Sequence, residues 1–188
     1  MIALLTTRVV IVGFCGIPLL VWASGGRADE YREQIAKTFV GFEILTRSDF
    51  TSEVQAIVKT DPGLVKGHFN SDNFEDFAAI ILDRSKQHGQ PGERKYYFGK
   101  YVVCHGAGKA RYQCQGLKEE RIYLPYEAFL FPVSPGRKIR CIANQENLST
   151  AEITLKRDAF GWAVPDRGSR IYIYQPDGTY SECGQPFD

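Results

Sequence analysis

From residue 64 onward, short apolar segments alternate with turn residues, and a chain of this kind must bury its strands in a sheet. Three turns are marked by Ser134-Pro135-Gly136, by residues 165–168 and by Pro176-Asp177-Gly178. Short strands with regular turn signals favour a mostly antiparallel sheet. The predicted strands cover residues 64–68, 77–82, 96–105, 110–117, 122–124, 128–133, 138–142, 151–155 and 170–174, followed by a last hairpin.

Two amphipathic segments precede these strands. Residues 29–40 carry apolar side chains at helical spacing after Asp29, a good helix cap, and residues 48–58 repeat the pattern before Pro62 and Gly63 end it. Such faces can dock a partner, but they more often cover a sheet. We therefore expect an α+β fold with two N-terminal helices packed on a mostly antiparallel β-sheet, which disulfides stabilise.

Residues 1–23 have the pattern of a secretory signal peptide. Arg8 precedes an apolar run over residues 9–20, and Val21-Trp22-Ala23 places small side chains where a signal peptidase cleaves. Cleavage after Ala28 is an alternative, and so is an uncleaved anchor, although the run is short for a bilayer span. The prediction is a cleaved signal, a periplasmic or secreted protein with no stable membrane span, and a single domain over residues 24–188.

Composition and charge are those of an ordinary globular protein. Of the 188 residues, 44% are apolar and 24% charged, and the formal net charge is +1. Without Arg8 the chain beyond the leader has 22 basic and 22 acidic side chains, since 23 minus one is 22, and it is neutral. There is no bulk positive charge to drive nucleic-acid binding, and none is expected.

A polar loop leads into the apolar strand at residues 77–82. Its side-chain oxygens recur at Asn70, Asp72 and Asp76. A tightly wound loop with this spacing can aim several oxygens at one centre, which is the geometry that calcium requires.

Residues 67–78, Gly-His-Phe-Asn-Ser-Asp-Asn-Phe-Glu-Asp-Phe-Ala, resemble the Gly-Asp-Phe-Asn-Gly-Asp-Gly-x-x-Asp-x-Ala signature of FG-GAP or VCBS-type repeats. Residues 155–160 and 170–180 resemble the ending of small bacterial periplasmic proteins that carry a single such loop. One copy cannot build a propeller, so that fold is rejected. The resemblance implies calcium as cofactor, held at the family's ligand positions: His68, Asn70, Asp72, the main-chain carbonyl of Phe74, and Asp76.

Two positions depart from that signature. His68 stands where the family has aspartate, and imidazole is a poor calcium ligand; Asn73 replaces the glycine of the sharp turn. The alternative is a metal-free asparagine-rich turn.

Four cysteines remain once Cys15 leaves with the signal peptide. An even number in an exported chain predicts two disulfides. Three pairings are possible; the 96–105 and 110–117 hairpin favours a local bridge, which leaves the other two cysteines as partners. Zinc is the alternative, although the chain has no Cys-x-x-Cys pair. The bridges would be Cys104 to Cys114 and Cys141 to Cys183.

No complete catalytic constellation is recognisable. The chain has no Gly-x-Ser-x-Gly, no glycine-rich phosphate loop and no His-Glu-x-x-His, so we name no catalytic and no cofactor-binding residue beyond the calcium loop. Glu119 with Glu120, or Asp72 with Asp76, could serve acid–base chemistry. A carboxylate-dependent hydrolase acting on cell-envelope material is therefore the alternative function.

Aromatic residues make up 13% of the chain and include an alternating pair near its end. Tyr172 and Tyr174 alternate with isoleucines, so one of the two sets must face outward or toward a second layer. With Tyr180 they form the candidate binding surface. The predicted function is an exported, non-catalytic protein that binds a partner protein, as an inhibitor, an immunity factor or an envelope-assembly factor.

Overall fold

The structure is a computed structural model, and it describes residues 26–108, 111–144 and 149–185. The helical elements are α1 (Gly26–Thr38), the 3₁₀ turn η1 (Arg47–Asp49) and α2 (Ser52–Ile57). The strands are β1 (Phe42–Ile44), β2 (Leu64–Gly67), β3 (Asp76–Asp83), β4 (Tyr97–Gly106), β5 (Tyr112–Ile122), β6 (Phe129–Val133), β7 (Lys138–Asn144), β8 (Ser149–Thr154), β9 (Ala159–Val164), β10 (Gly168–Tyr174) and β11 (Tyr180–Gln185).

The predicted α+β fold with two helices packed on a sheet is wrong. Of the described residues, 49% lie in strands and 14% in helices, and α1 alone among the described helices reaches seven residues. The second helix is short because local hydrogen bonds compete with it. The Asp49 carboxylate caps the main chain at Thr46 and closes η1, while Arg47 donates to the Val58 carbonyl (2.9 Å) beyond the end of α2. Val54 is the one α2 residue that is buried.

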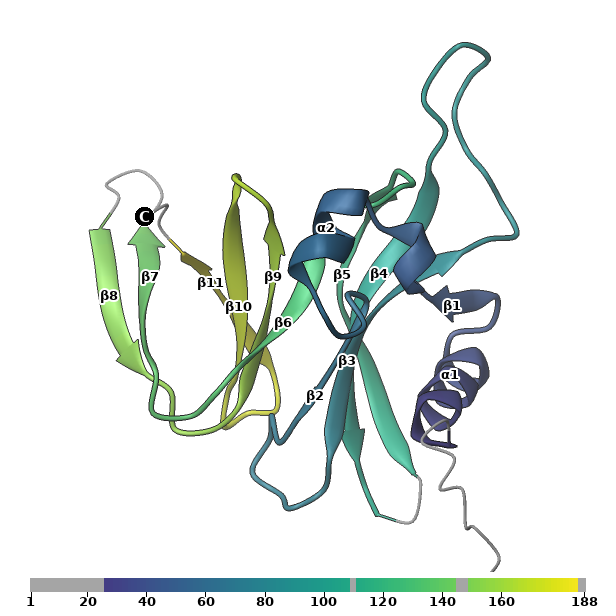
Figure 1. Ribbon diagram of the computed structural model, residues 1–188. Coiled ribbons are helices and arrows are strands. Elements are labelled where there is room, and N and C mark those ends of the chain that lie inside the picture. The colour runs from purple at the N-terminus through teal and green to yellow at the C-terminus, as the bar shows by residue number, and fades with distance from the viewer. Residues whose placement is uncertain (1–25, 109–110, 145–148, 186–188) are drawn as a thin grey trace, which may run out of the picture.

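The strands form two larger sheets and a separate hairpin (Figure 1). The N-terminal sheet has the order β1-β3-β4-β5. β2 pairs with the first half of β3, along the same edge of β3 that β1 pairs with further on. The C-terminal sheet has the order β11-β10-β9-β6, and β7 pairs with β8. All of these strand pairs are antiparallel.

Both faces of the N-terminal sheet are covered, which explains the unbroken apolar run of β3. Phe77 and Ile81 lie with Tyr31 of α1 in one apolar cluster. Ile80 and Leu82 point the opposite way, into the main core between the two sheets. Alternate side chains of one strand therefore serve two different cores, and the strand has no polar face.

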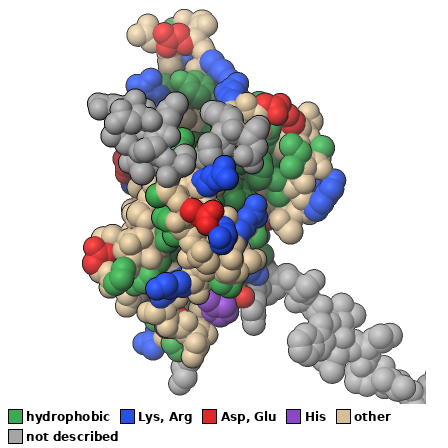
Figure 2. All heavy atoms as spheres, turned by 90° about the vertical axis from the view of Figure 1, so that its left-hand side faces the viewer, with side chains coloured by type: hydrophobic (Ala, Val, Ile, Leu, Met, Phe, Trp, Pro, Cys, Tyr) green, Lys and Arg blue, Asp and Glu red, His purple; other side chains and the backbone are tan. Residues whose placement is uncertain are grey.

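The side of the molecule that carries β8 has a mixed surface. Figure 2 shows basic, acidic and apolar side chains interspersed there, without a patch of one sign. None of the described helices is long and apolar enough to cross a membrane. The predicted signal peptide, residues 1–23, lies outside the described residues.

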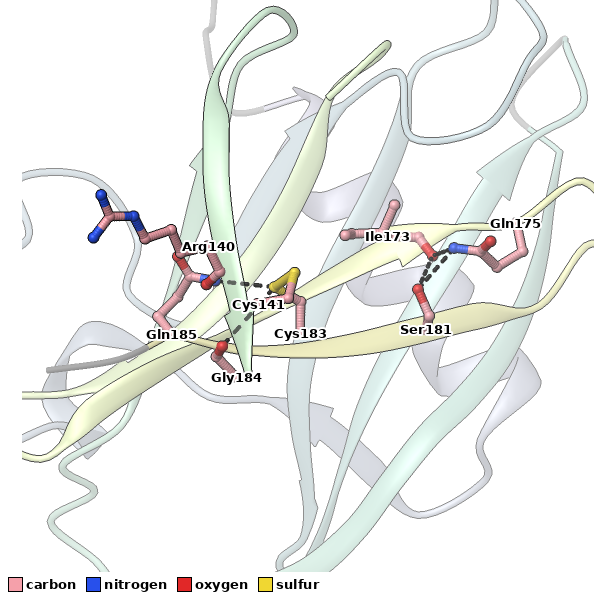
Figure 3. The surroundings of a disulfide bond; sticks show 8 residues. All are labelled: Arg140, Cys141, Ile173, Gln175, Ser181, Cys183, Gly184 and Gln185. Carbon is pink, nitrogen blue, oxygen red and sulfur yellow. Dashed lines mark hydrogen bonds between the residues drawn. A yellow bond between two sulfur atoms is a disulfide. The ribbon is translucent and has the colours of Figure 1, made fainter. Parts of the chain in front are cut away.

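The disulfides link neighbouring strands and layers. Cys104 of β4 is bonded to Cys114 of β5, and Cys141 of β7 to Cys183 of β11. This is the pairing that the predicted hairpin favoured. Figure 3 shows the second bridge, near which the Gln185 side chain donates to a main-chain carbonyl of β7 (3.0 Å). The bridge holds the β7–β8 hairpin against the C-terminal sheet, over a third apolar cluster.

Candidate functional site

A groove of about 650 Å³ opens at one end of the C-terminal sheet. The groove is lined by residues 153–159, from the end of β8 to the start of β9, and by residues 173–176 at the end of β10. One serine of β11 and one of the β2–β3 loop complete the lining. In Figure 1 these connections lie together at the lower ends of the strands. The lining combines apolar, aromatic and basic side chains: Ile153, Leu155, Ala159, Ile173, Pro176, Tyr174, Lys156 and Arg157.

The predicted calcium loop forms a wall of this groove. Ser71 from the loop lines it, and Asp158 of the β8–β9 connection accepts a hydrogen bond from the main-chain N–H of His68 (2.9 Å). The site therefore unites two segments whose linking residues, His68 and Asp158, are 90 positions apart in the sequence.

Asp76 fixes the loop from inside. Its carboxylate is fully buried, and it accepts main-chain hydrogen bonds from Phe69 (2.7 Å), Asn70 (3.2 Å) and Gly106 (3.0 Å). Three N–H donors of this kind satisfy a buried carboxylate and make it a structural connection. Asp76 thus joins the β2–β3 loop to the end of β4.

The other predicted calcium ligands also bond within the loop. Asn70 donates its amide to Asp72 (2.7 Å) and accepts from the main-chain N–H of Asp72 (2.9 Å). Asp72 also accepts from the N–H of Phe74 (2.9 Å), whose carbonyl oxygen lies 2.9 Å from Nδ1 of His68. A carbonyl can only accept, so Nδ1 carries the proton.

As arranged, the predicted ligand oxygens accept hydrogen bonds from within the loop. The imidazole N–H of His68 occupies the Phe74 carbonyl that the resemblance assigns to the metal. Within the described part of the chain, no group of three or more His, Cys, Asp or Glu side chains could hold a metal. Calcium binding stays a prediction that a titration has to decide.

Beneath the groove, an aromatic cluster surrounds His105. Its Nδ1 lies 3.3 Å from Asp76, and its Nε2 lies 3.3 Å from the hydroxyl of Tyr180, whose ring stacks on it. Tyr174 meets both rings edge-on. Burial raises the pKa of the Tyr180 hydroxyl and the Asp76 charge raises it further, so this group stays protonated.

The three tyrosines of the predicted binding surface occupy different environments. Tyr174 lines the groove, and Tyr180 is half-buried behind it. Tyr172 is only 4% exposed and belongs to the core between the sheets. Of the three, Tyr174 alone lines the groove wall.

Arg157 is a functional candidate that the sequence pattern does not single out. Its guanidinium carbon lies 5.7 Å from the centroid of the Tyr174 ring. Its Nη1 is shielded from solvent and has no hydrogen-bond partner within the described residues. A Lys-Arg pair before a turn is usually a solvated face, so only the folded structure distinguishes this arginine.

The two predicted carboxylate pairs do not converge on a cleft. Glu119 pairs with Lys100 across one face of β5, while Glu120 accepts from Lys118 (2.8 Å) and from the Tyr126 hydroxyl. Asp72 and Asp76 are likewise separated, since one is exposed and the other fully buried. This arrangement does not suit acid–base hydrolysis.

Comparison with protein-family models, with curated proteins and with solved structures found no match.

Proposed function

We propose that this is an exported, non-catalytic binding protein that holds a segment of a partner protein in the groove beside the β2–β3 loop. The observation that carries the proposal is the groove itself, which is large enough for several side chains and joins apolar walls to basic and aromatic groups.

The walls of the groove are held in place before any ligand arrives. Asp76 fixes the loop through three main-chain bonds, and the Cys141–Cys183 bridge fixes the β7–β8 hairpin. In the β10–β11 turn, Asp177 accepts from the main-chain N–H of Thr179 (3.0 Å). A preformed site loses less conformational entropy on binding, which favours a binding role.

Export to the periplasm or the exterior agrees with the two disulfides, which persist in oxidising compartments. The neutral balance of the chain beyond the leader gives no electrostatic reason for a nucleic-acid partner. Inhibition, immunity and envelope assembly are the roles that such a protein can fill. The hydrolase alternative has less support, because the candidate carboxylates lie apart.

Site-specific photo-crosslinking in the producing cells tests this proposal. A photo-reactive amino acid at Lys156, which lines the groove, should crosslink to a discrete partner, whereas the same amino acid at the exposed Lys59 should not. Excess purified wild-type protein should compete. An Ile153→Trp competitor, which fills the groove, should fail, while Ile57→Trp, a matched change on exposed α2, should compete normally.

Two results would refute a groove-binding role. One is the same crosslinking pattern from both positions. The other is equal competition by the Ile153→Trp and Ile57→Trp proteins.

A further inference from the structure

The charge on Arg157 has no counter-charge in the described chain. Within residues 26–108, 111–144 and 149–185, no carboxylate forms an ion pair with it. Arg84, by comparison, pairs with both Glu43 (3.0 Å) and Asp49 (2.6 Å). Shielding part of a guanidinium without a partner is unfavourable, so Arg157 is poised to gain an anion.

The acidic groups around Arg157 are already engaged. Asp158 lines the groove and accepts the N–H of His68, and Asp76 lies behind Tyr180 with both oxygens bonded to main-chain donors. Lys156 adds a second positive charge to the same wall. The lining thus sets Lys156 and Arg157 against the single carboxylate of Asp158, and this positive balance attracts a negatively charged group from outside the chain.

We propose that Arg157 binds a carboxylate, and that the groove takes a peptide segment in which this carboxylate adjoins an apolar side chain. The inference rests on the proposed binding function and names the chemistry of the partner segment. Its carboxylate can belong to an Asp or Glu side chain or to the partner's C-terminus.

Two features favour a carboxylate over other anions. The guanidinium of Arg157 lies over the Tyr174 ring, and its planar set of N–H donors matches a planar carboxylate, with which it can form two parallel hydrogen bonds. The neighbouring Ile153 is 39% exposed and, with Ile173 and Pro176, offers an apolar surface that a phosphate ion would leave uncovered. A carboxylate followed by an aliphatic side chain can bind the guanidinium and cover the apolar surface at the same time.

The test is a titration of ¹⁵N-labelled protein observed by NMR at the main-chain amide and arginine Nε–Hε resonances. The probes are acetyl-Gly-Ile-Glu-Ile-Gly-amide, its Gln counterpart, the tetrapeptide Gly-Ile-Gln-Ile with a free C-terminus, and inorganic phosphate. The Glu peptide should shift the Arg157 and Tyr174 resonances saturably, and the Gln amide should bind at least about tenfold more weakly. The free tetrapeptide shows whether a terminal carboxylate also serves.

Arg157→Gln should weaken binding of the Glu peptide by at least about tenfold, whereas Arg137→Gln, a matched change at an exposed arginine outside the groove, should leave it unchanged. Without peptide, Arg157→Gln should melt no lower than wild type, because removing a shielded charge that has no counter-charge offsets the loss of its contact with Tyr174. The melting temperature of Arg157→Gln also shows that this variant folds.

Equal binding of the Glu and Gln peptides, with no tighter binding of the free tetrapeptide, would overturn the carboxylate inference and leave groove binding intact. Tighter binding of phosphate than of either carboxylate peptide would also overturn it, and so would wild-type affinity in Arg157→Gln. If no peptide binds at millimolar concentration, the inference fails on its own, because the crosslinking from Lys156 tests the binding function separately.

Discussion

Replacing Asp76 should destabilise the fold far more than replacing Asp72, with or without calcium. Asp76→Ala leaves the main-chain N–H groups of Phe69, Asn70 and Gly106 without their acceptor. An unsatisfied buried donor costs about 1 to 3 kcal/mol, and partial hydration of the loop offsets some of the sum, so the expected loss is about 3 to 5 kcal/mol.

Asp72→Ala is the matched control. Asp72 is exposed, and its bonds run to neighbours within the loop that water can also satisfy. Its loss should cost less than about 1 kcal/mol. Asp76→Asn, which keeps one acceptor oxygen, should lie between the two.

The assay is urea unfolding at neutral pH, once with excess calcium and once with a chelator. The free energy of unfolding for Asp76→Ala should fall by the same amount in both, because the lost partners are protein N–H groups. Equal losses for Asp76→Ala and Asp72→Ala would refute this reasoning. A loss confined to the calcium-containing series would show that the loop is held by metal.

Three further predictions concern the loop, the long disulfide and the partly exposed ion pair of Arg84 with Asp49. His68→Asp places an oxygen at the first ligand position and frees the Phe74 carbonyl, so calcium should raise the melting temperature of this variant and not that of wild type. A calcium-dependent rise in wild type would contradict this prediction. Replacing Cys141 and Cys183 by alanine should lower the free energy of unfolding, measured in urea, by about 4 kcal/mol, because this bridge restricts the unfolded chain over a separation of 42 residues. A loss smaller than the roughly 3 kcal/mol expected for the Cys104–Cys114 bridge would contradict this explanation. Burial raises the pKa of Asp49, but the hydrogen bond from Arg84 and those from the main-chain N–H and the hydroxyl of Thr46 outweigh it and hold the pKa below its usual value. The stability lost in Arg84→Gln should therefore be full at neutral pH and shrink below about pH 4, and a pH-independent difference would argue against the pair.

Most of the strands were predictable from the sequence, but β9 was not. β9 reads Ala-Phe-Gly-Trp-Ala-Val, with Gly161 at its centre, and an internal glycine normally indicates a break in a strand. In the fold this glycine allows close approach: a Cβ there would lie 2.5 Å from the Arg170 carbonyl oxygen and 2.6 Å from the Phe131 ring. Both neighbours come from other strands, so no local pattern reveals the requirement.

The candidate site could be predicted only where its residues are close in sequence. The loop was visible because its oxygens recur within a few positions, whereas Arg157 and Tyr174, 17 positions apart, meet only because β9 pairs with β10 and brings the ends of that hairpin together. The chemistry of the loop was also ambiguous, because oxygens aimed at one centre can accept hydrogen bonds as readily as they bind a cation.

Whether such oxygens accept hydrogen bonds or bind a cation depends on how many N–H donors lie close to them. A cation is needed where carboxylates converge with no N–H groups to meet them. Here the N–H groups of Phe69, Asn70 and Gly106 converge on Asp76, and the imidazole of His68 donates to the Phe74 carbonyl. His68, one of the two positions that depart from the calcium signature, thus donates to the Phe74 carbonyl in place of a metal. Changing His68 alone should therefore make the loop favour calcium.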